Sequence, residues 1–112
     1  MTIEQLKDFG ANVEEGLNRC VNNEAFYLRL VGMVPGNASF KELSDAISQN
    51  DLEKAFSAAH ALKGILANLS LTPLLKPVEE ITEKLRAKEA ADYGSLLTEI
   101  EDKRSILAEL CA

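Results

Sequence analysis

A histidine, a lysine and a glycine within five residues form the part of this sequence whose residue types suggest chemistry. The only histidine of the chain, His60, is followed by Lys63 and Gly64 in the stretch AHALKGILANLS. An imidazole is partly unprotonated near neutral pH and can act as a nucleophile. On a helix, side chains at i+3 and i+4 lie beside residue i, so a cation and a vacancy would flank the ring. The cation would stabilise incoming negative charge, and the vacancy would admit another protein.

The helix predicted over residues 51–69 turns His60 away from its apolar face. At about 100° per residue, the core-facing positions gather on one side. These positions are Ala55, Ala58, Leu62, Ile65, Leu66 and Leu69. We therefore expect His60 to be exposed, which argues against a core histidine and leaves an ordinary surface histidine as the alternative.

A predicted partner-binding surface surrounds His60 on the same helix. The positions within about 60° of the histidine include its candidate residues. These are Glu53, Phe56, Ser57 and Ala67. Phe56 is expected to be exposed and to form a small apolar docking patch beside Gly64. An equally good alternative is that the N-terminal helices fold over Phe56. Asn68, about 80° from His60, is either a solubilising residue at the helix end or a rim contact.

Apolar residues recur at helical spacing along almost the whole chain, and capping residues stand at the breaks. The pattern predicts helices over residues 2–10, 12–20, 23–34, 39–49, 51–69, from 72 onward, and 92–110. Short connections force neighbouring amphipathic helices to run antiparallel. The predicted fold is all-α, an antiparallel up-and-down four-helix bundle with additional short N-terminal helices, in one domain over residues 1–112.

The helix ends and stripes carry more specific expectations. Capping boxes are predicted at Thr2 with Gln5, Ser39 with Glu42, and Asn50 with Glu53. Asn23, Thr72 and Asp92 are predicted to cap other helices, and Phe26, Leu30 and Val34 to share one stripe. Pro77 predicts a kink or an irregular first turn in its helix. The segment EITEKLRAKEAAD, residues 80–92, is expected to be solvated helix surface.

Composition and charge exclude several classes of protein. A net charge of −6 argues against binding the nucleic-acid backbone, which requires clustered basic residues. The acidic N-terminal stretch is not expected to be a signal peptide, and no apolar run is long enough to span a membrane. We therefore expect no membrane association and a cytoplasmic location. Its two cysteines, Cys20 and Cys111, lie far apart and support neither a zinc site nor a disulfide framework.

A nucleophilic histidine beside a cation is suited to accept a phosphoryl group. The sequence lacks, however, the other parts that a phosphoryl-transferring enzyme needs. We find no P-loop, no glycine-rich nucleotide fingerprint, no second histidine and no acidic metal cluster. A histidine that accepts a phosphoryl group in a chain that cannot bind ATP must receive the group from a partner. We therefore expect a carrier without independent kinase activity and without a metal or cofactor of its own.

The stretch AHALKGILANLSL resembles the motif of the histidine-containing phosphotransfer (HPt) domain family, with His60, Leu62, Lys63 and Gly64 at matching positions. The chain differs where many members have glycine, at Ala67 and Ser70, and near a position often occupied by glutamate, at Thr82. The resemblance implies a four-helix bundle and a phosphoprotein of a two-component phosphorelay. It further implies His60 as phospho-acceptor, Lys63 as a positioning and charge-neutralising residue, and Gly64 as clearance.

The resemblance also implies the partners: a response-regulator receiver domain, which carries the magnesium, and a sensor or hybrid histidine kinase. Two alternatives stay open at this stage. One is a non-catalytic helical adaptor that binds a protein partner, and the other is a dimeric phosphotransferase built from paired helical hairpins. The closed set of capped helices favours a monomer, which we expect to act as a stand-alone protein.

Overall fold

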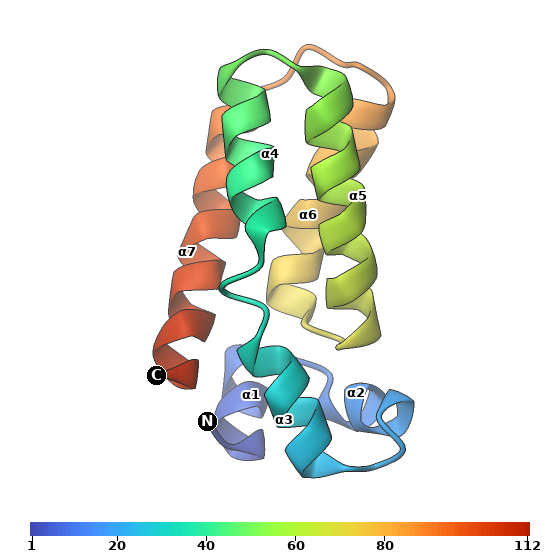
Figure 1. Ribbon diagram of the computed structural model, residues 1–112, viewed down its shortest axis with the longest axis vertical. Coiled ribbons are helices and arrows are strands. Elements are labelled where there is room, and N and C mark those ends of the chain that lie inside the picture. The colour runs from blue at the N-terminus through green and yellow to red at the C-terminus, as the bar shows by residue number, and fades with distance from the viewer.

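Four long antiparallel helices form the body of the protein, and three short helices cover one end of it. The computed structural model describes residues 1–112, which measure 40 × 24 × 20 Å and contain no strand (Figure 1). The short helices are α1 (Ile3–Phe9), α2 (Val13–Arg19) and α3 (Glu24–Gly32). The long helices are α4 (Ala38–Ser48), α5 (Leu52–Asn68), α6 (Thr72–Arg86) and α7 (Tyr93–Cys111). The predicted four-helix bundle with short N-terminal helices is confirmed. No helix combines the length and the apolarity needed to cross a bilayer.

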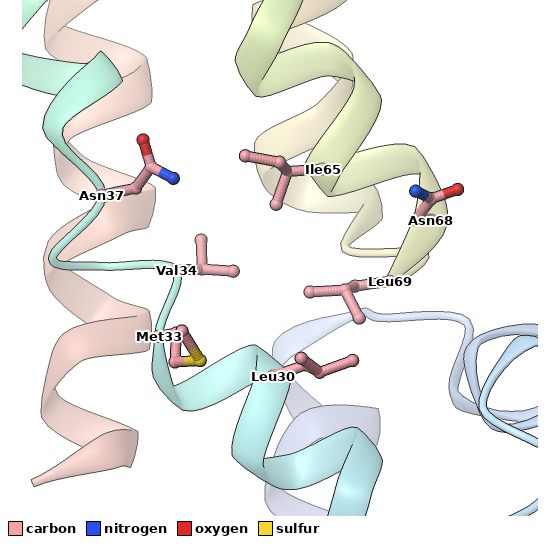
Figure 2. Close-up of a pocket in the computed structure, with 7 residues that line it drawn as sticks. All are labelled: Leu30, Met33, Val34, Asn37, Ile65, Asn68 and Leu69. Carbon is pink, nitrogen blue, oxygen red and sulfur yellow. The ribbon is translucent and has the colours of Figure 1, made fainter.

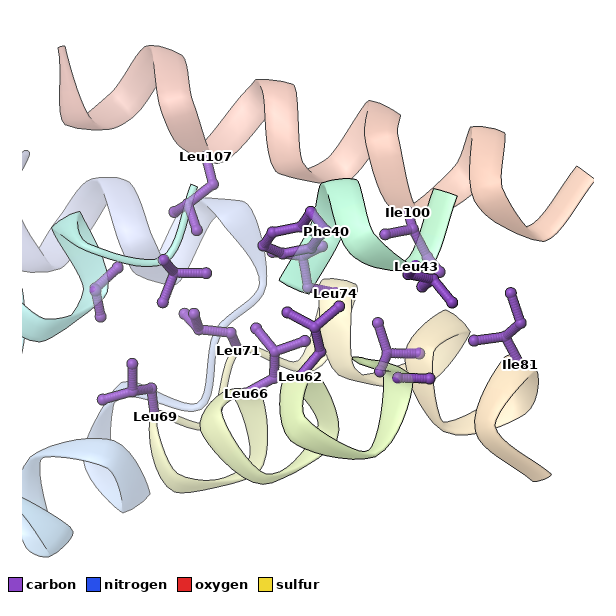
Figure 3. Close-up of a cluster of buried hydrophobic side chains, with 14 of the residues drawn as sticks. Phe40, Leu43, Leu62, Leu66, Leu69, Leu71, Leu74, Ile81, Ile100 and Leu107 are labelled. Carbon is purple, nitrogen blue, oxygen red and sulfur yellow. The ribbon is translucent and has the colours of Figure 1, made fainter. Parts of the chain in front are cut away.

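The hydrophobic core lies between the four long helices and continues among the short N-terminal helices (Figure 3). Within it, α5 packs most extensively against α4 and α6. Leu62 and Leu66 of α5 are completely buried, as the helical wheel predicts. The three other helices contribute further buried residues along the length of the bundle, namely Leu43, Leu74, Ile81, Ile100 and Leu107. One face of α5 is therefore buried in the core along most of the helix.

Several predicted helix ends are confirmed because the capping side chains bond to the first turn. Thr2 and Gln5 form the reciprocal capping box of α1, and Gly10 ends that helix at a φ of 109°. The side chain of Asn23 accepts the backbone N–H of Phe26, and that of Asp92 accepts the N–H of Ser95. Each cap supplies an acceptor to an N–H group that has no partner inside the helix.

Three predicted caps are wrong by one or two residues. Asn37, not Ser39, caps α4, because its side-chain oxygen accepts the Ser39 N–H at 2.8 Å. Asp51, not Asn50, caps α5, since Asn50 has a φ of 56° and belongs to the turn that ends α4. Thr72 is the first residue of α6, whose N-cap Leu71 makes no side-chain bond. Asn and Asp cap as well as Ser, so these signals compete.

The buried stripe of α3 also differs from the prediction. Tyr27 and Val31 point into the protein, whereas Phe26 is 45% exposed, and α3 ends at Gly32. Val34, beyond the helix, is buried as expected. The rotation follows from the packing of α3 across the end of the bundle, where the Tyr27 side chain can reach a hydrogen-bond partner that Phe26 cannot use.

α6 is continuous from Thr72 through Pro77, so the predicted irregular first turn is wrong, while the alternative, a kink, stays a prediction. The carbonyl that an N–H at this position would bond is that of Pro73, in the first turn. The loss of one hydrogen bond so close to the helix start leaves the following turns intact. Pro77 is buried, and its ring contributes to the packing of α6.

The short helices hold the C-terminal end of α5. The Arg19 guanidinium donates to the Ala67 carbonyl at 2.5 Å and to the Ser70 hydroxyl at 2.8 Å. The Tyr27 hydroxyl donates to the Leu69 carbonyl at 2.8 Å. The last carbonyls of a helix have no partner inside it, and a cation there also complements the helix dipole. α2 and α3 therefore cap α5 with side chains.

We predict that Gly16→Ala destabilises the protein by about 1 to 3 kcal/mol, the usual cost of overpacking a rigid site. A Cβ at residue 16 would lie 2.6 Å from Cε1 of Tyr27, whose ring cannot move without loss of its hydrogen bond. Urea unfolding followed by circular dichroism measures the change. Gly32→Ala is the control, because nothing lies within 4 Å of its Cβ position. Equal stability of the two variants would contradict this packing.

We predict that the protein loses stability between about pH 10 and pH 12 through Tyr27. Burial, followed by the nearby Cys20, raises the pKa of Tyr27 from 10.0 to about 12. Because the folded protein holds this proton more tightly, the contribution is complete below the unfolded pKa and disappears as the pH rises through the folded one. The expected loss is about 2 to 3 kcal/mol, measured as the urea midpoint against pH. Tyr27→Phe should abolish this alkaline loss, and an unchanged profile in that variant would contradict the assignment.

Candidate functional site

His60 lies on the exposed side of α5, as predicted. Leu62, on the opposite side of the helix, and the adjacent Ala59 are completely buried, whereas the imidazole faces solvent. The imidazole makes no hydrogen bond within the protein, and its aromatic neighbour is Phe56, whose ring centroid lies 5.7 Å away at an interplanar angle of 54°. The ring nitrogens are therefore free to react with a group that arrives from solvent.

Lys63 and Gly64 follow the histidine by one turn of α5. The Lys63 side chain is 35% exposed, and its Nζ lies 3.9 Å from Oε1 of Glu83 on α6. At Gly64, a Cβ would have nothing within 4 Å. The glycine is therefore not required by packing inside the chain. The vacancy opens onto solvent, beside the only imidazole of the protein.

Phe56 is half-buried, so it is neither fully exposed nor covered by the N-terminal helices, and its docking role stays a prediction. It packs partly against the core, and the Arg86 guanidinium lies 5.0 Å from its ring centroid, within cation–π range. The N-terminal helices lie at the opposite end of the bundle and do not cover it (Figure 1). A residue of α6 therefore shields the ring that contacts His60.

The structure adds Glu83 and Arg86 to the site, and sequence reasoning missed both. Glu83 Oε2 lies 3.3 Å from Arg86 Nε, so one carboxylate contacts both Arg86 and Lys63. Both residues belong to the segment that was expected to be solvated surface. They are exposed, but their charges reach the side chains around His60. The antiparallel pairing of α5 with α6 is the signal that could have placed them there.

The predicted partner-binding surface is spread along α5. Glu53 and Ser57 are exposed, Ala67 is half-buried, and Glu53 and Ala67 lie about 21 Å apart along the helix. Glu53, Phe56 and Ser57 line a shallow hollow with residues of α6 and of the turn after it, namely Leu85, Arg86 and Lys88. His60 lies between this hollow and Ala67.

An apolar groove of about 260 Å³ lies between α3 and the C-terminal half of α5 (Figure 2). Its lining residues are Leu30, Met33, Val34, Asn37, Ile65, Asn68 and Leu69. Asn68, for which two roles were open, stands at the rim of this groove, and Met33 is 66% exposed. The groove is on the same helix as His60, but on a neighbouring side.

Thr82 does not contact the imidazole. It is completely buried, and its hydroxyl donates to the Val78 carbonyl at 2.6 Å. This hydrogen bond satisfies the buried hydroxyl inside α6. Ser70 stands where many members of the similar family have glycine. Its φ is 54°, a conformation that favours glycine. Its hydroxyl accepts from Arg19 and donates to Glu15.

The family model of the Hpt domain matches residues 37–110 of this chain. The match begins at the N-cap of α4 and ends in the last turn of α7, so it covers all four helices of the bundle. No curated protein and no solved structure gave a match. The exposed histidine on α5, the bundle and the family match agree: the chain belongs to the Hpt domain family, whose members carry out histidine phosphotransfer in phosphorelays.

Proposed function

We propose that His60 accepts a phosphoryl group from the aspartyl phosphate of one receiver domain and passes it to the aspartate of another. The observation that carries this proposal is the placement of the only imidazole on the open face of α5, beside a cation and an unobstructed stretch of backbone. The chain acts in this scheme as a phosphoryl carrier and not as an independent kinase.

The transfer needs only groups that this chain and a receiver supply. The lone pair of the neutral imidazole forms a bond to phosphorus, the bond between phosphorus and the acyl oxygen breaks, and the aspartate leaves as a carboxylate. Lys63 balances the negative charge that collects on the phosphoryl oxygens. The magnesium that assists this chemistry belongs to the receiver domain. The reverse sequence of bond changes returns the group to a second receiver.

Gly64 provides the clearance that the partner requires. With no side chain at this position, a receiver backbone can approach the imidazole until the reacting atoms are in contact. Glu53, Phe56, Ser57 and Ala67 are the proposed contacts on either side. The proposed partners are a response-regulator receiver domain and a sensor or hybrid histidine kinase, met in the cytoplasm by a monomer of this chain.

A non-catalytic helical adaptor is the competing function, and a dimeric phosphotransferase is the second. The adaptor binds its partner through a bundle face and never carries phosphate that is acid-labile and base-stable. Nothing in the packing of the bundle requires the histidine, the lysine and the glycine to share the open face, which favours the carrier. Sedimentation at increasing concentration distinguishes a monomer from a dimer.

His60→Gln is expected to abolish phosphate labelling by receiver domains charged with acetyl phosphate. A panel of receiver domains from the same organism provides the donors. The native protein should acquire acid-labile, base-stable phosphate, and the variant should acquire none while its circular dichroism spectrum stays unchanged. Labelling that persists in the variant, or the absence of labelling by every receiver, would exclude the proposed carrier.

Gly64→Leu is expected to reduce the rate of transfer by about 10- to 100-fold, because a misplaced partner loses the alignment that the reaction needs. Gly64→Ala should instead raise the free energy of unfolding by up to about 1 kcal/mol. Ser105→Leu, at an exposed position of α7, is the control for an added surface leucine. Rapid-quench transfer assays measure the rates, and native transfer by Gly64→Leu would refute the clearance role.

A further inference from the structure

Glu83 is the one acidic side chain that contacts the cations on both sides of the histidine. Its Oε1 lies 3.9 Å from Lys63 Nζ, and its Oε2 lies 3.3 Å from Arg86 Nε. The Glu83 side chain is 59% exposed and that of Lys63 is 35% exposed, so water and ligands reach both. An exposed ion pair of this length is weak and exchanges readily for a stronger partner.

Glu83 is linked to the surroundings of His60 in two ways, one through helical spacing and one through a chain of contacts. One passes through Lys63, which is placed one helical turn after the histidine. The other passes through Arg86, whose guanidinium lies over the Phe56 ring, and Phe56 in turn contacts the imidazole. The imidazole has no hydrogen bond of its own, and Thr82, which precedes Glu83, bonds to the Val78 carbonyl. Glu83 is therefore the residue of α6 that contacts both cations near the histidine, Lys63 and Arg86.

We propose that Glu83 is a positioning residue for phosphoryl transfer, which holds the Lys63 ammonium while His60 is free and releases it to the phosphoryl group. The proposal rests on the proposed function of His60. The exchange makes and breaks no covalent bond: Lys63 leaves a carboxylate with one negative charge and meets phosphoryl oxygens that carry more. The Glu83 carboxylate keeps its contact with Arg86, so the Phe56 ring stays in place.

The same contact makes Glu83 a competitor of the incoming phosphoryl group. Any anionic donor must draw Lys63 away from Glu83 before the ammonium can neutralise it. Removal of the Glu83 charge should therefore speed the arrival of the phosphoryl group, provided that Lys63 is present. This dependence on Lys63 separates a positioning role from the general effect of one fewer negative charge.

Chemical phosphorylation of His60 by phosphoramidate tests this directly and needs no receiver. In the reaction the P–N bond of phosphoramidate breaks, ammonia leaves, and phosphorus bonds to the imidazole nitrogen. Glu83→Gln should raise the labelling rate constant by about two- to five-fold, the range that exposed ion pairs support. The measurement is made at about pH 8, where an imidazole is ordinarily uncharged, and at low salt.

Glu80→Gln is the matched control. Glu80 lies one turn away on the same helix, is exposed, forms no ion pair and lines a hollow with residues of α7 instead. This control should label at the native rate. In a Lys63→Met background, Glu83→Gln should lose most of its effect, and high salt should reduce it in the native background. Thermal unfolding of each variant verifies that the bundle is intact.

An equal acceleration by Glu80→Gln, an undiminished effect in the Lys63→Met background, or no acceleration by Glu83→Gln would each overturn the positioning role. These outcomes are independent of receiver binding. If the phosphoramidate series behaves as expected but no charged receiver labels His60, the proposed function fails, and what remains is only that Glu83 restrains Lys63 beside a reactive imidazole.

Discussion

The burial of one face of α5 between α4 and α6 is the constraint on which the rest of the structure depends. Leu62 and Leu66 are completely buried, and a helix cannot bury these positions without turning His60 outward. The imidazole is thus positioned by the largest favourable energetic term in the fold, the removal of apolar surface from water. A site on a rigid helix of this kind is held more precisely than a site on a loop.

The C-terminal end of α5 is held by a second set of interactions, whose N-terminal partners lie outside the region matched by the family model. Arg19 and Tyr27 supply donors to the Ala67 and Leu69 carbonyls, so α2 and α3 are tied to the helix that carries His60. Ser70, in a conformation that favours glycine, is held by Arg19 and Glu15. The hydrogen bonds from α2 thus stabilise Ser70, a serine in a backbone conformation that favours glycine.

The charges around His60 contribute little to stability, and this leaves them available for function. Lys63, Glu83 and Arg86 are linked by ion pairs at 3.9 and 3.3 Å on a solvated surface, where each pair stabilises by less than about 1 kcal/mol. Such contacts can be exchanged for other partners at little cost to the stability of the bundle. Stability resides in the apolar interior, and the exchangeable contacts lie on the open face.

Much of the fold could be predicted because helical periodicity and capping are local. The spacing of apolar residues sets the face of each helix, and it correctly separated His60, Lys63 and Gly64 from the core. Where capping signals were adjacent, as at Asn50 and Asp51, the sequence did not decide between them, because both residue types can accept the same N–H groups. The buried stripe of α3 was misplaced because the Tyr27 hydroxyl bonds to a carbonyl 42 residues away.

The sequence by itself determined which residues share the open face of α5, because that follows from the geometry of one helix. Only the tertiary structure decided what surrounds them. Arg86 over Phe56, and Glu83 between Lys63 and Arg86, depend on the register with which α6 packs against α5. That register is set by side-chain packing between segments about twenty residues apart, which no local pattern encodes.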